Sequence, residues 1–258
     1  MMAPEPLPRL YTELASWFHL LTAPADYAEE EEFYRRAFLD ASSEPPRTLL
    51  ELGSGGGNLA SHYKRHFKST LVDLAPDMLA LSQTINPECE HLRGDMRTVR
   101  LGRVFDCVFV HDAVMYLTTA EDLRQAMTTA FVHCRPGGVA IFAPDCTRET
   151  FAASTDHGGH DGAGRSLRYL EWTWDPDPTD TTYLVDFAYL LREDGKPMRC
   201  EHDRHLNGLF GRDEWLRLLA EVGFRATVHS FSHSEVPRGP LDVFVAIRPG
   251  QGGRPTAA

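Results

Sequence analysis

Apolar and polar residues follow one pattern in the middle of this chain and another in its last third. Between residues 46 and 143, short apolar runs alternate with segments in which apolar residues recur every three or four positions. The first kind of segment predicts strands and the second predicts helices. Because the two kinds alternate, we expect a parallel sheet with helices on both faces. The expected strands are 48–52, 69–73, 89–92, 104–110 and 139–143, with helices at 76–84 and 121–134.

The pattern changes after residue 165. Residues 168–174, 182–192 and 198–206 alternate apolar and polar positions, and turn sequences separate them. This predicts an antiparallel sheet inserted at about residues 166–207, as a cover over the crevice of the main sheet. With two further strands, the expected main fold is a doubly wound, mostly parallel α/β sheet of seven strands. The last predicted elements are a helix at 213–222 and strands at 226–231 and 242–247.

The two ends of the chain differ from the sheet region. Apolar residues between positions 10 and 41 recur at helical spacing, and Pro24 divides them into two predicted helices. We expect residues 1–45 to form a helical lid and residues 46–248 to form the main domain. Residues 249–258 are rich in glycine and proline, which predicts a disordered tail.

The most informative motif begins where the first strand ends, as Glu51-Leu52-Gly53-Ser54-Gly55-Gly56-Gly57. Glycine permits positive φ angles and lets the backbone approach a ligand closely. Glu51 stands where a strand of an open α/β sheet reaches the crevice above its carboxyl end. This order predicts a nucleotide-binding loop. The alternatives are an ordinary glycine-rich turn and a dinucleotide site, since Gly55-x-Gly57-x-x-Ala60 also fits the NAD pattern.

Acidic residues end the next two strands as well. Asp73 follows Glu51 by 22 residues, and Asp95 lies in Gly94-Asp95-Met96. Together with the glycine loop, these residues resemble the class I S-adenosylmethionine (SAM) methyltransferases. The resemblance implies a Rossmann-like fold and a loop in which Gly53, Gly55 and Gly57 hold SAM.

The resemblance also implies a role for each residue of the pocket. Glu51 is expected to accept a hydrogen bond from the amino group of SAM, and Asp73 to accept both ribose hydroxyls. Asp95 is expected to bond the adenine amino group, and the backbone amide of Met96 to meet a ring nitrogen. Met78 is expected to pack on the adenine. NAD is disfavoured, because Glu51 lies just before the glycines, where a SAM enzyme needs an acceptor for the amino group, whereas a dinucleotide site offers the bare helix N-terminus to a pyrophosphate.

A narrower resemblance covers most of the chain. The chain is similar to the N,N-dimethyltransferases that act on nucleotide-linked amino sugars in antibiotic pathways. Two segments depart from that family, residues 111–116 and 171–178, which leaves the methyl acceptor open. The matching residues are Tyr11, Leu14, Asp26-Tyr27-x-x-Glu30, Gly94-Asp95-Met96-Arg97, Asp203-x-His205-Leu206-x-x-Leu209-Phe210, Glu214-Trp215, Gly223-Phe224 and Arg238-Gly239.

Methyl transfer requires a nucleophile held in line with the methyl group and the exclusion of water. We expect a polar group just beyond the fourth strand to face the methyl group. His111 and Asp112 stand at this point of the sequence. We expect His111 to contact the cofactor or the substrate as a base or orienting group, with a structural role as the alternative. Asp112 and Tyr116 are the other catalytic candidates. Tyr11 and Tyr27 are candidates to close over the cofactor.

Other residue types suggest contacts to the acceptor. His205 is a candidate substrate or structural residue, and Trp172 and Trp174 share one strand face, where they form either an acceptor platform or a packing surface. His202 and His205 lie on opposite faces of a strand, which is poor geometry for chelation, so we expect no metal.

Composition excludes several classes of partner. The formal net charge is −11 and the pI is near 5.5, with three lysines and scattered arginines. Nucleic-acid binding needs clustered basic residues, so we expect no nucleic-acid partner. No apolar run reaches the length of a membrane span, and the five cysteines are dispersed, which favours the cytoplasm.

Taken together, the sequence predicts a SAM-dependent methyltransferase of a small molecule in secondary metabolism. N-methylation of a nucleotide-linked amino sugar is the first hypothesis. O- or carboxyl-methylation of another metabolite is the alternative within the same class. A non-catalytic SAM-binding or scaffold protein is the alternative from another class. A homodimer contact through the inserted strands is left open.

Overall fold

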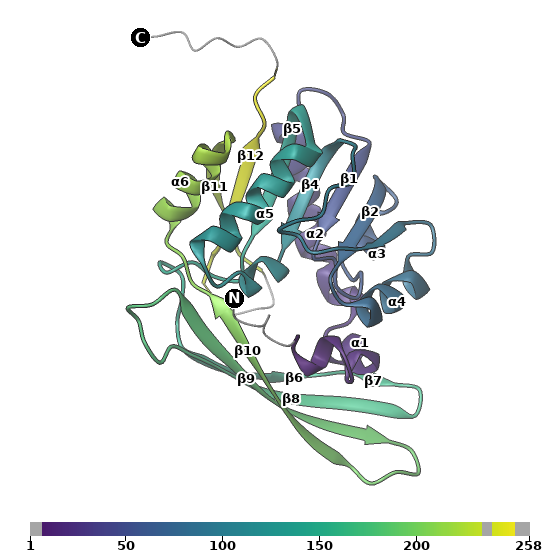
Figure 1. Ribbon diagram of the computed structural model, residues 1–258. Helices are drawn as coiled ribbons and strands as arrows, with labels where there is room; N and C mark the ends of the chain where they lie inside the picture. The colour runs from purple at the N-terminus through teal and green to yellow at the C-terminus, as the bar shows by residue number, and fades with distance from the viewer. Residues whose placement is uncertain (1–6, 234–238, 251–258) are drawn as a thin grey trace.

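The computed structural model describes residues 7–233 and 239–250, and a seven-stranded sheet forms its centre (Figure 1). The strand order is β11-β12-β5-β4-β1-β2-β3. All neighbours are parallel except β12, which runs antiparallel to both β11 and β5. This confirms the predicted doubly wound α/β fold. The strands are β1 Thr48–Leu52, β2 Lys68–Asp73, β3 Glu90–Arg93, β4 Phe105–His111, β5 Cys134–Ala143, β11 Arg225–Phe231 and β12 Leu241–Ile247.

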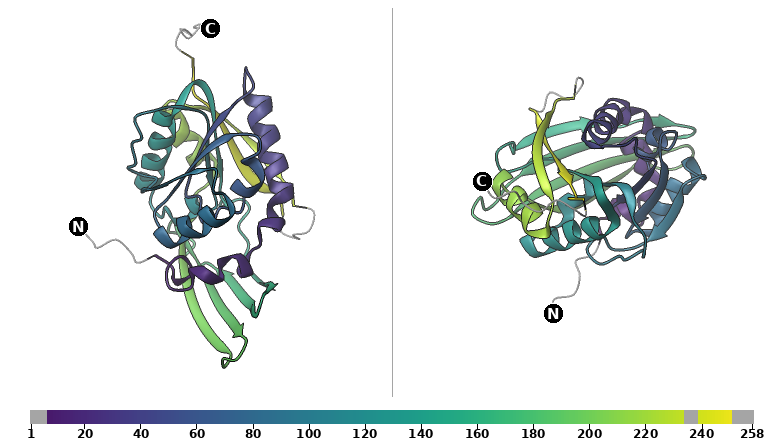
Figure 2. Two further views of the ribbon diagram at one scale, coloured as in Figure 1. Left: turned by 90° about the vertical axis from the view of Figure 1, so that its right-hand side faces the viewer. Right: turned by 90° about the horizontal axis from the view of Figure 1, so that it is seen from above.

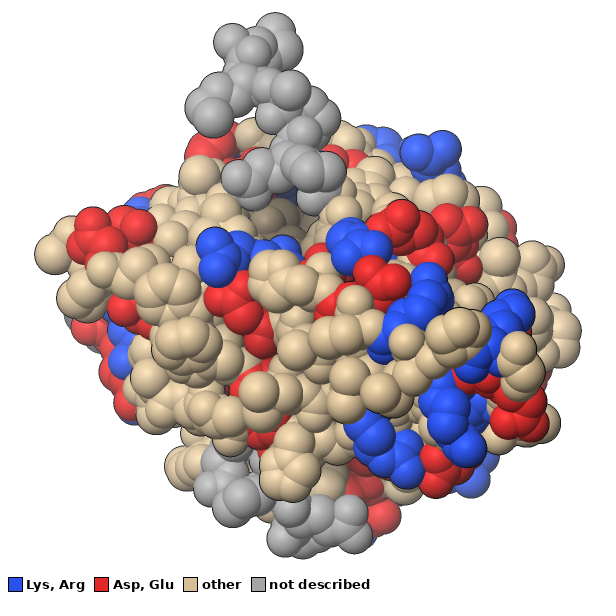
Figure 3. Space-filling model, turned by 90° about the horizontal axis from the view of Figure 1, so that it is seen from below, with Lys and Arg blue, Asp and Glu red and all other residues tan. Residues whose placement is uncertain are grey.

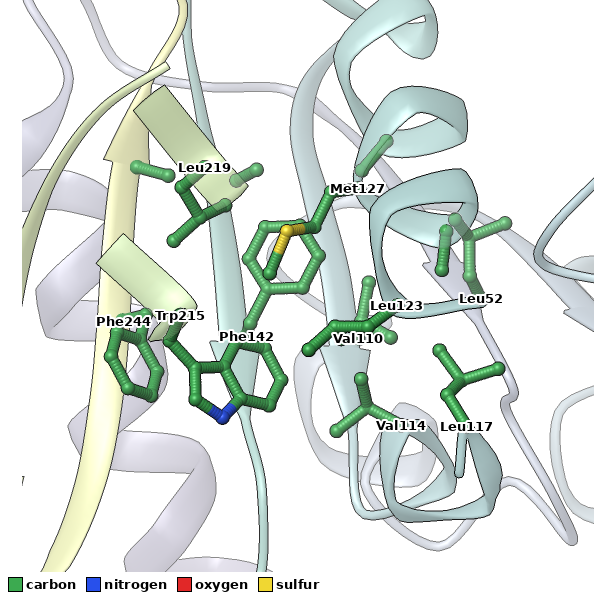
Figure 4. Packing of buried hydrophobic residues seen from close by; sticks show 14 of the residues in the cluster. Leu52, Val110, Val114, Leu117, Leu123, Met127, Phe142, Trp215, Leu219 and Phe244 are labelled. Carbon is green, nitrogen blue, oxygen red and sulfur yellow. The ribbon is translucent and has the colours of Figure 1, made fainter. Parts of the chain in front are cut away.

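The central strands are buried on both faces, which is why their sequences are almost continuously apolar. On β4, Val108 and Val110 face one core, and Cys107 and Phe109 face the other. Helices α5 (Ala120–His133) and α6 (Arg212–Val222) cover the first face, as Figure 4 shows in detail. Helices α2 (Ala28–Ala41) and α3 (Ala60–Tyr63) cover the second. No helix in the described part of the chain has both the length and the apolar character needed to span a bilayer.

Helix boundaries follow local chemistry. The Thr119 hydroxyl accepts a hydrogen bond from the Asp122 amide at the start of α5, at 3.1 Å. Gly223 ends α6 in the left-handed conformation, with φ 114°. Pro76 is the first residue of α4 (Pro76–Ile85), where its missing N–H costs nothing. One prediction is corrected: Arg135-Pro136-Gly137-Gly138 lies inside β5, which begins at Cys134, and not in a loop before it.

A second, antiparallel sheet of five strands lies beneath the carboxyl ends of the parallel strands (Figures 1 and 2). Its order is β10-β9-β8-β6, and β7 pairs with β8. The sequence predicted three of these strands and missed β6 and β7. The missed strands contain Ser154-Thr155-Asp156-His157-Gly158 and Asp161-Gly162, which have no apolar alternation to detect. The strands are β6 Ser154–Gly158, β7 Asp161–Gly162, β8 Arg165–Trp174, β9 Thr182–Glu193 and β10 Arg199–Gly208.

The N-terminal segment lies between the two sheets (Figure 1). The first of the two predicted helices is corrected, because residues 9–27 form short turns of helix instead. Leu10, Leu14 and Trp17 pack against Leu167 and Tyr189 of the antiparallel sheet. A straight helix cannot follow both this surface and the glycine loop, so the segment breaks into pieces. These are η1 Arg9–Tyr11, η2 Ala15–Trp17, α1 Phe18–Leu21 and η3 Pro24–Tyr27.

Candidate active site

The glycine loop after β1 adopts a backbone that other residues rarely adopt. Gly53, Gly55 and Gly57 have φ angles of 79°, 52° and 77°. A Cβ atom on Gly53 would lie 2.4 Å from the Cβ of Ala113, and one on Gly57 would lie 2.2 Å from the Oγ of Ser82. Both glycines are therefore required by close packing as well as by conformation.

Gly55 differs from its neighbours because it faces open space. The nearest atom to a Cβ placed there is the Met78 methyl group, at 3.9 Å. The Gly55 amide donates a hydrogen bond of 2.7 Å to Asp73, and the Ala75 amide donates one of 2.8 Å to the other Asp73 oxygen. Each carboxylate oxygen keeps capacity for a second donor. Asp73 is thus fixed beside Gly55, the glycine of this loop with the most space around it.

Glu51 is buried at the end of β1, on the face covered by α2 and α3. It is 3% exposed, and its carboxyl group accepts a hydrogen bond from the hydroxyl of Tyr63. Burial raises the pKa of Glu51 to about 8, although the hydrogen bond from Tyr63 and the charge of His111 act against this shift. Glu51 is therefore mostly protonated at neutral pH in the absence of a positively charged ligand.

Asp95 is held by its neighbour Arg97. The Arg97 guanidinium bonds both Asp95 oxygens, with its closest contact at 2.7 Å, and it also bonds Asp122 at 3.0 Å. Burial alone would raise the pKa of Asp95, but the bonds from Arg97 lower it below the usual range. Met96 lies against Gly53, since its methyl group would be 2.8 Å from a Cβ there. The turn after β3 is thus packed on the glycine loop.

The N-terminal segment covers the glycine loop from the other side. The His19 ring is hydrogen bonded to the Gly56 carbonyl oxygen at 3.1 Å, and the Phe18 ring would lie 2.6 Å from a Cβ on Gly56. Met78 is 1% exposed and packs with Ala15 and with the Phe18 ring. The residue predicted to contact adenine is therefore covered by the segment predicted to be a lid.

Four ionisable residues, called here the carboxylate–histidine cluster, meet beyond β4 and β5. They are Glu30, His111, Asp112 and Asp145. The Nε2 atom of His111 lies 3.1 Å from Glu30 Oε2 and 2.9 Å from Asp112 Oδ1. Asp112 has φ 33°, a positive value that is uncommon outside glycine and typical of constrained functional positions.

The charges of this cluster depend on one another. Burial alone would lower the pKa of His111, but Asp112 and Glu30 raise it well above the usual range. Burial alone would raise the pKa of Asp112, but the charge of His111 and hydrogen bonds with His111 and Asp145 lower it. These shifts favour a protonated His111 beside an ionised Asp112, a form better suited to orienting a neighbour than to accepting a proton.

A second group, called here the tyrosine–histidine chain, connects three distant parts of the sequence. The hydroxyl groups of Tyr11 and Tyr116 are 2.7 Å apart, and the Tyr116 hydroxyl is 2.7 Å from Nδ1 of His205. Nε2 of His205 lies 3.2 Å from Asp203. The structure thus brings together three residues that the sequence singled out separately. Tyr27 lies in the other group, with its ring centroid 6.4 Å from that of His111.

Trp172 and Trp174 do not join these groups. Leu167 and Tyr169 of β8 face the N-terminal segment, so Trp172 and Trp174 point to the opposite face of the sheet. Trp172 is 54% exposed, and the two indole rings stack with centroids 5.5 Å apart. This placement contradicts the acceptor-platform interpretation and favours the packing interpretation. Among the described residues, no three His, Cys, Asp or Glu side chains are placed to hold a metal ion.

Sequence analysis did not select several residues that the structure places in these groups. Asp145 follows β5 by two residues, so the rule that selected Asp73 and Asp95 at strand ends would have found it. Glu30 and Asp203 stood within the matched motifs, but nothing local indicated their partners. Tyr63 carried no signal beyond its place on a short helix.

Comparisons with known proteins agree with this arrangement. The profile of a methyltransferase domain family matches residues 49–138. The dTDP-3-amino-3,4,6-trideoxy-alpha-D-glucopyranose N,N-dimethyltransferase of Streptomyces venezuelae is 30% identical over 214 residues, which are 78% of this chain and 84% of that protein. The dTDP-3-amino-3,6-dideoxy-alpha-D-glucopyranose N,N-dimethyltransferase of Streptomyces fradiae is 25% identical over 72% of this chain and 73% of its own.

Two solved structures have the same fold over nearly the whole chain. The crystal structure of DesVI from Streptomyces venezuelae gives a TM-score of 0.77 at 26% identity, covering 93% of this chain and 98% of that one. The structure of the sugar N-methyltransferase KedS8 from a Streptoalloteichus species gives 0.79 at 24% identity and covers 96% of both chains. Both sheets of the present fold are therefore shared with solved proteins.

Proposed function

The chain belongs to the class I S-adenosylmethionine-dependent methyltransferases, and from this premise we propose that it methylates the amino group of a nucleotide-linked amino sugar in secondary metabolism. The observation that carries the proposal is the carboxylate–histidine cluster, which groups acidic side chains around His111 at the end of β4, where we expect the acceptor amine. The relatives in Streptomyces are named as N,N-dimethyltransferases of dTDP-linked amino sugars, which supports the same acceptor class.

The residues present fit SAM. Gly55 offers open backbone next to Asp73, whose oxygens keep capacity for ribose hydroxyl groups. A buried Ser54 hydroxyl without a hydrogen-bond partner among the described residues lies in the same loop. SAM, when bound, would supply an activated methyl group: an amine can attack the methyl carbon, and the sulfur leaves with S-adenosylhomocysteine. In our proposal Gly53, Gly55 and Gly57 hold the cofactor, and Asp73 binds the ribose.

The other cofactor contacts are assigned from the positions of the residues around the glycine loop. Glu51 would accept a hydrogen bond from the amino group of SAM, and the positive charge of that group would favour the ionised form of the Glu51 carboxylate. Asp95 and Met96 would contact the adenine. Arg97 already bonds both Asp95 oxygens. We therefore propose that the backbone amide of Met96 contributes more than Asp95 to adenine binding. Met78 would pack on the adenine from the side that the N-terminal segment covers.

The acceptor would lie between the two groups of residues described above. Asp112 would accept a hydrogen bond from the acceptor's ammonium group, because its lowered pKa keeps its carboxylate ionised. His111 would orient Asp112, and Tyr116 and His205 would position the sugar. Carboxylates repel an acceptor that is itself a carboxylate, so carboxyl-methylation is disfavoured.

We propose that residues 1–45 close over the cofactor and exclude water, with Tyr11 and Tyr27 as the closing side chains. Burial raises the pKa of Tyr27 well above the usual range, consistent with a hydroxyl kept away from solvent. The main domain would then be residues 46–248, with the antiparallel insertion as the floor of the acceptor site. Of the tail predicted at residues 249–258, residues 251–258 lie outside the described part of the chain, as does Arg238.

We also propose that the outer face of the antiparallel sheet forms a homodimer contact. This face carries the stacked Trp172 and Trp174 and the exposed side chains of Leu170 and Leu190. Figure 3 shows uncharged areas on this side of the molecule, with acidic and basic side chains among them. Exposed apolar area of this kind usually marks an interface. Light scattering after gel filtration tests the contact: a monomer for the unmodified chain excludes it, and Trp172→Ser should convert a dimer to monomer.

Cysteine chemistry suggests the compartment. All five cysteines are free, and burial raises the pKa of the Cys89 thiol to about 11. Thiols in this state fit a reducing compartment, so we propose the cytoplasm.

The acceptor proposal is tested in two steps. Titration calorimetry with SAM and, in parallel, NAD establishes the cofactor, and we expect heat with SAM alone. The protein is then incubated with SAM and dTDP-3-amino-3,4,6-trideoxyglucose, with dTDP-glucose as a hydroxyl control. Mass spectrometry should show methylated amino sugar and unchanged dTDP-glucose. SAM binding without methylation of amino sugars, or equal methylation of dTDP-glucose, would refute the amine assignment while leaving the cofactor assignment intact.

A further inference from the structure

Asp203 of β10 holds the first helical turn of the chain from almost two hundred residues away. Its carboxylate accepts the amide of Leu10 at 2.8 Å and the amide of Arg9 at 3.1 Å. These amides begin η1, and the preceding residue, Pro8, provides no side-chain cap. The first amides of a helical turn lack partners within the helix. Asp203 therefore supplies the cap that the local sequence lacks.

The same carboxylate also ends the tyrosine–histidine chain, and this closes a ring. From Asp203 the ring passes through His205, then Tyr116, then the Tyr11 hydroxyl, and returns through the backbone of Leu10. Asp203 and His205 are each 4% exposed, and Leu10 is 2% exposed. Asp203 thus bonds the backbone directly before Tyr11 and is connected to the Tyr11 hydroxyl through His205 and Tyr116. Hydrogen bonds to a buried charge are among the stronger ones in proteins.

The ring joins the two functional regions through the N-terminal segment. Within ten residues of Leu10, the segment packs Phe18 and His19 on the glycine loop and Ala15 on Met78. The other end of the ring is on the inner face of the antiparallel sheet, where His205 lies beside Phe187 with ring centroids 5.0 Å apart. The N-terminal segment therefore contacts the glycine loop through Phe18 and His19 and the antiparallel sheet through Leu10.

We propose that Asp203 is a positioning residue that latches the N-terminal segment shut over the bound cofactor and sets the place of Tyr11. Release of the spent cofactor then requires the ring to open at Asp203. Asp203 lies on β10 of the antiparallel sheet, so a change in that sheet would alter how tightly the N-terminal segment covers the cofactor pocket. This inference depends on the SAM pocket but not on the identity of the acceptor.

The test uses a cleavage site that the chain provides inside the latch. Trypsin cuts after arginine, and the Arg9–Leu10 bond is the one whose amide is bonded to Asp203. We expect Asp203→Asn to speed the loss of residues 1–9 on the order of tenfold, because the new side-chain amide would donate where a carboxylate oxygen accepted. Mass spectrometry measures this loss over time. S-adenosylhomocysteine should slow the cut in the unmodified chain and protect the variant much less.

The matched control is Asp186→Asn. Asp186 lies on the outer face of the same sheet, where it bonds Arg204 at 2.8 Å and His202 at 2.9 Å. It is the same chemical change in the same sheet, but away from the N-terminal segment, and it should leave cleavage at Arg9–Leu10 unchanged. Equal acceleration in both variants would show general loosening of the sheet and would overturn the latch.

Two further measurements distinguish a latch from a residue that only stabilises the fold. They also test the proposal if Asp203→Asn fails to fold. Tyr116→Phe removes one hydroxyl from the ring and should speed cleavage by a few-fold. Asp203→Asn should also raise the dissociation rate of S-adenosylhomocysteine about tenfold while melting at the temperature of Asp186→Asn. Wild-type cleavage and dissociation rates in both Tyr116→Phe and Asp203→Asn would refute the proposal.

Discussion

The cofactor half and the acceptor half of this protein are built in opposite ways. The cofactor half lies within residues 51–97, where each acidic residue ends a strand beside the next, and Gly55 and Asp73 are bonded across 18 positions. The acceptor half joins Tyr11, Tyr116 and His205 across separations of 105 and 89 positions. One half is a local motif on a parallel sheet, and the other exists only where three segments converge.

This difference predicts different consequences of substitution. In the cofactor half the backbone itself is the binding surface, so a small change of shape removes binding. In the acceptor half the side chains are charged and coupled, so a change alters turnover or closure while the cofactor still binds. Each of the following experiments tests whether the two halves separate in this way.

The largest effect is expected from Gly53→Ala. The added methyl group would meet Ala113 at 2.4 Å and Met96 at 2.8 Å, at a φ of 79°. We expect SAM affinity in calorimetry to fall at least ~100-fold, because the loop must shift away from the cofactor. The control is Gly102→Ala, at φ 67° with no described atom within 4 Å, where only backbone strain of about 1 kcal/mol applies. Normal SAM binding by Gly53→Ala would show that this loop is not the cradle.

A smaller effect, confined to the acceptor half, is expected from His111→Gln. The change removes the cation between Glu30 and Asp112 but keeps a hydrogen-bond donor. We expect turnover to fall about tenfold, because Asp112 loses the charged partner that orients it, and SAM affinity to change less than about twofold. His202→Gln, at a side chain 64% exposed, serves as the control and should be neutral. Parallel loss of SAM affinity would move His111 into the cofactor half.

The smallest effect is a pH dependence located at Glu51. Its pKa in the folded protein is raised to about 8 by burial, so the folded state holds a proton that the unfolded chain releases near its ordinary pKa of about 4.3. This stabilisation is complete below that ordinary pKa and is lost as pH rises through about 8. Without cofactor, stability should fall by about 1 kcal/mol between about pH 7 and pH 8.5.

Denaturant titration of the unmodified chain and of Glu51→Gln at both pH values measures the pH dependence of the free energy of unfolding that Glu51 causes. The variant has no proton to lose at this position, so its stability should change less over the same interval. Identical pH profiles for the two proteins would place Glu51 in a solvated environment. SAM affinity should run in the opposite direction and rise with pH in the unmodified chain, because the ionised carboxylate is the better acceptor for an amino group.

Much of the fold was predictable because each strand of the parallel sheet is buried on both faces and is followed by its helix. The continuous apolar sequences of β1, β2 and β4 indicated buried strands directly. The strands β6 and β7 did not, because they are short polar edge pieces whose pairing with β8 holds them in place. The helical spacing of residues 9–21 was misleading for a related reason: contacts with two surfaces at once outweigh the preference for one straight helix.

Local sequence was enough to predict the cofactor half, since strand ends of a parallel sheet meet at one edge and bring Glu51, Asp73 and Asp95 there. The sequence also selected Tyr11, Tyr116 and His205 one by one, but their connection into one chain ending at Asp203 is visible in the folded structure alone. The tertiary structure also decided that Trp172 and Trp174 face outward and that His111 carries charge. The physical reason is that strand geometry is local, whereas burial, charge coupling and the choice of sheet face depend on what packs on each residue from elsewhere in the chain.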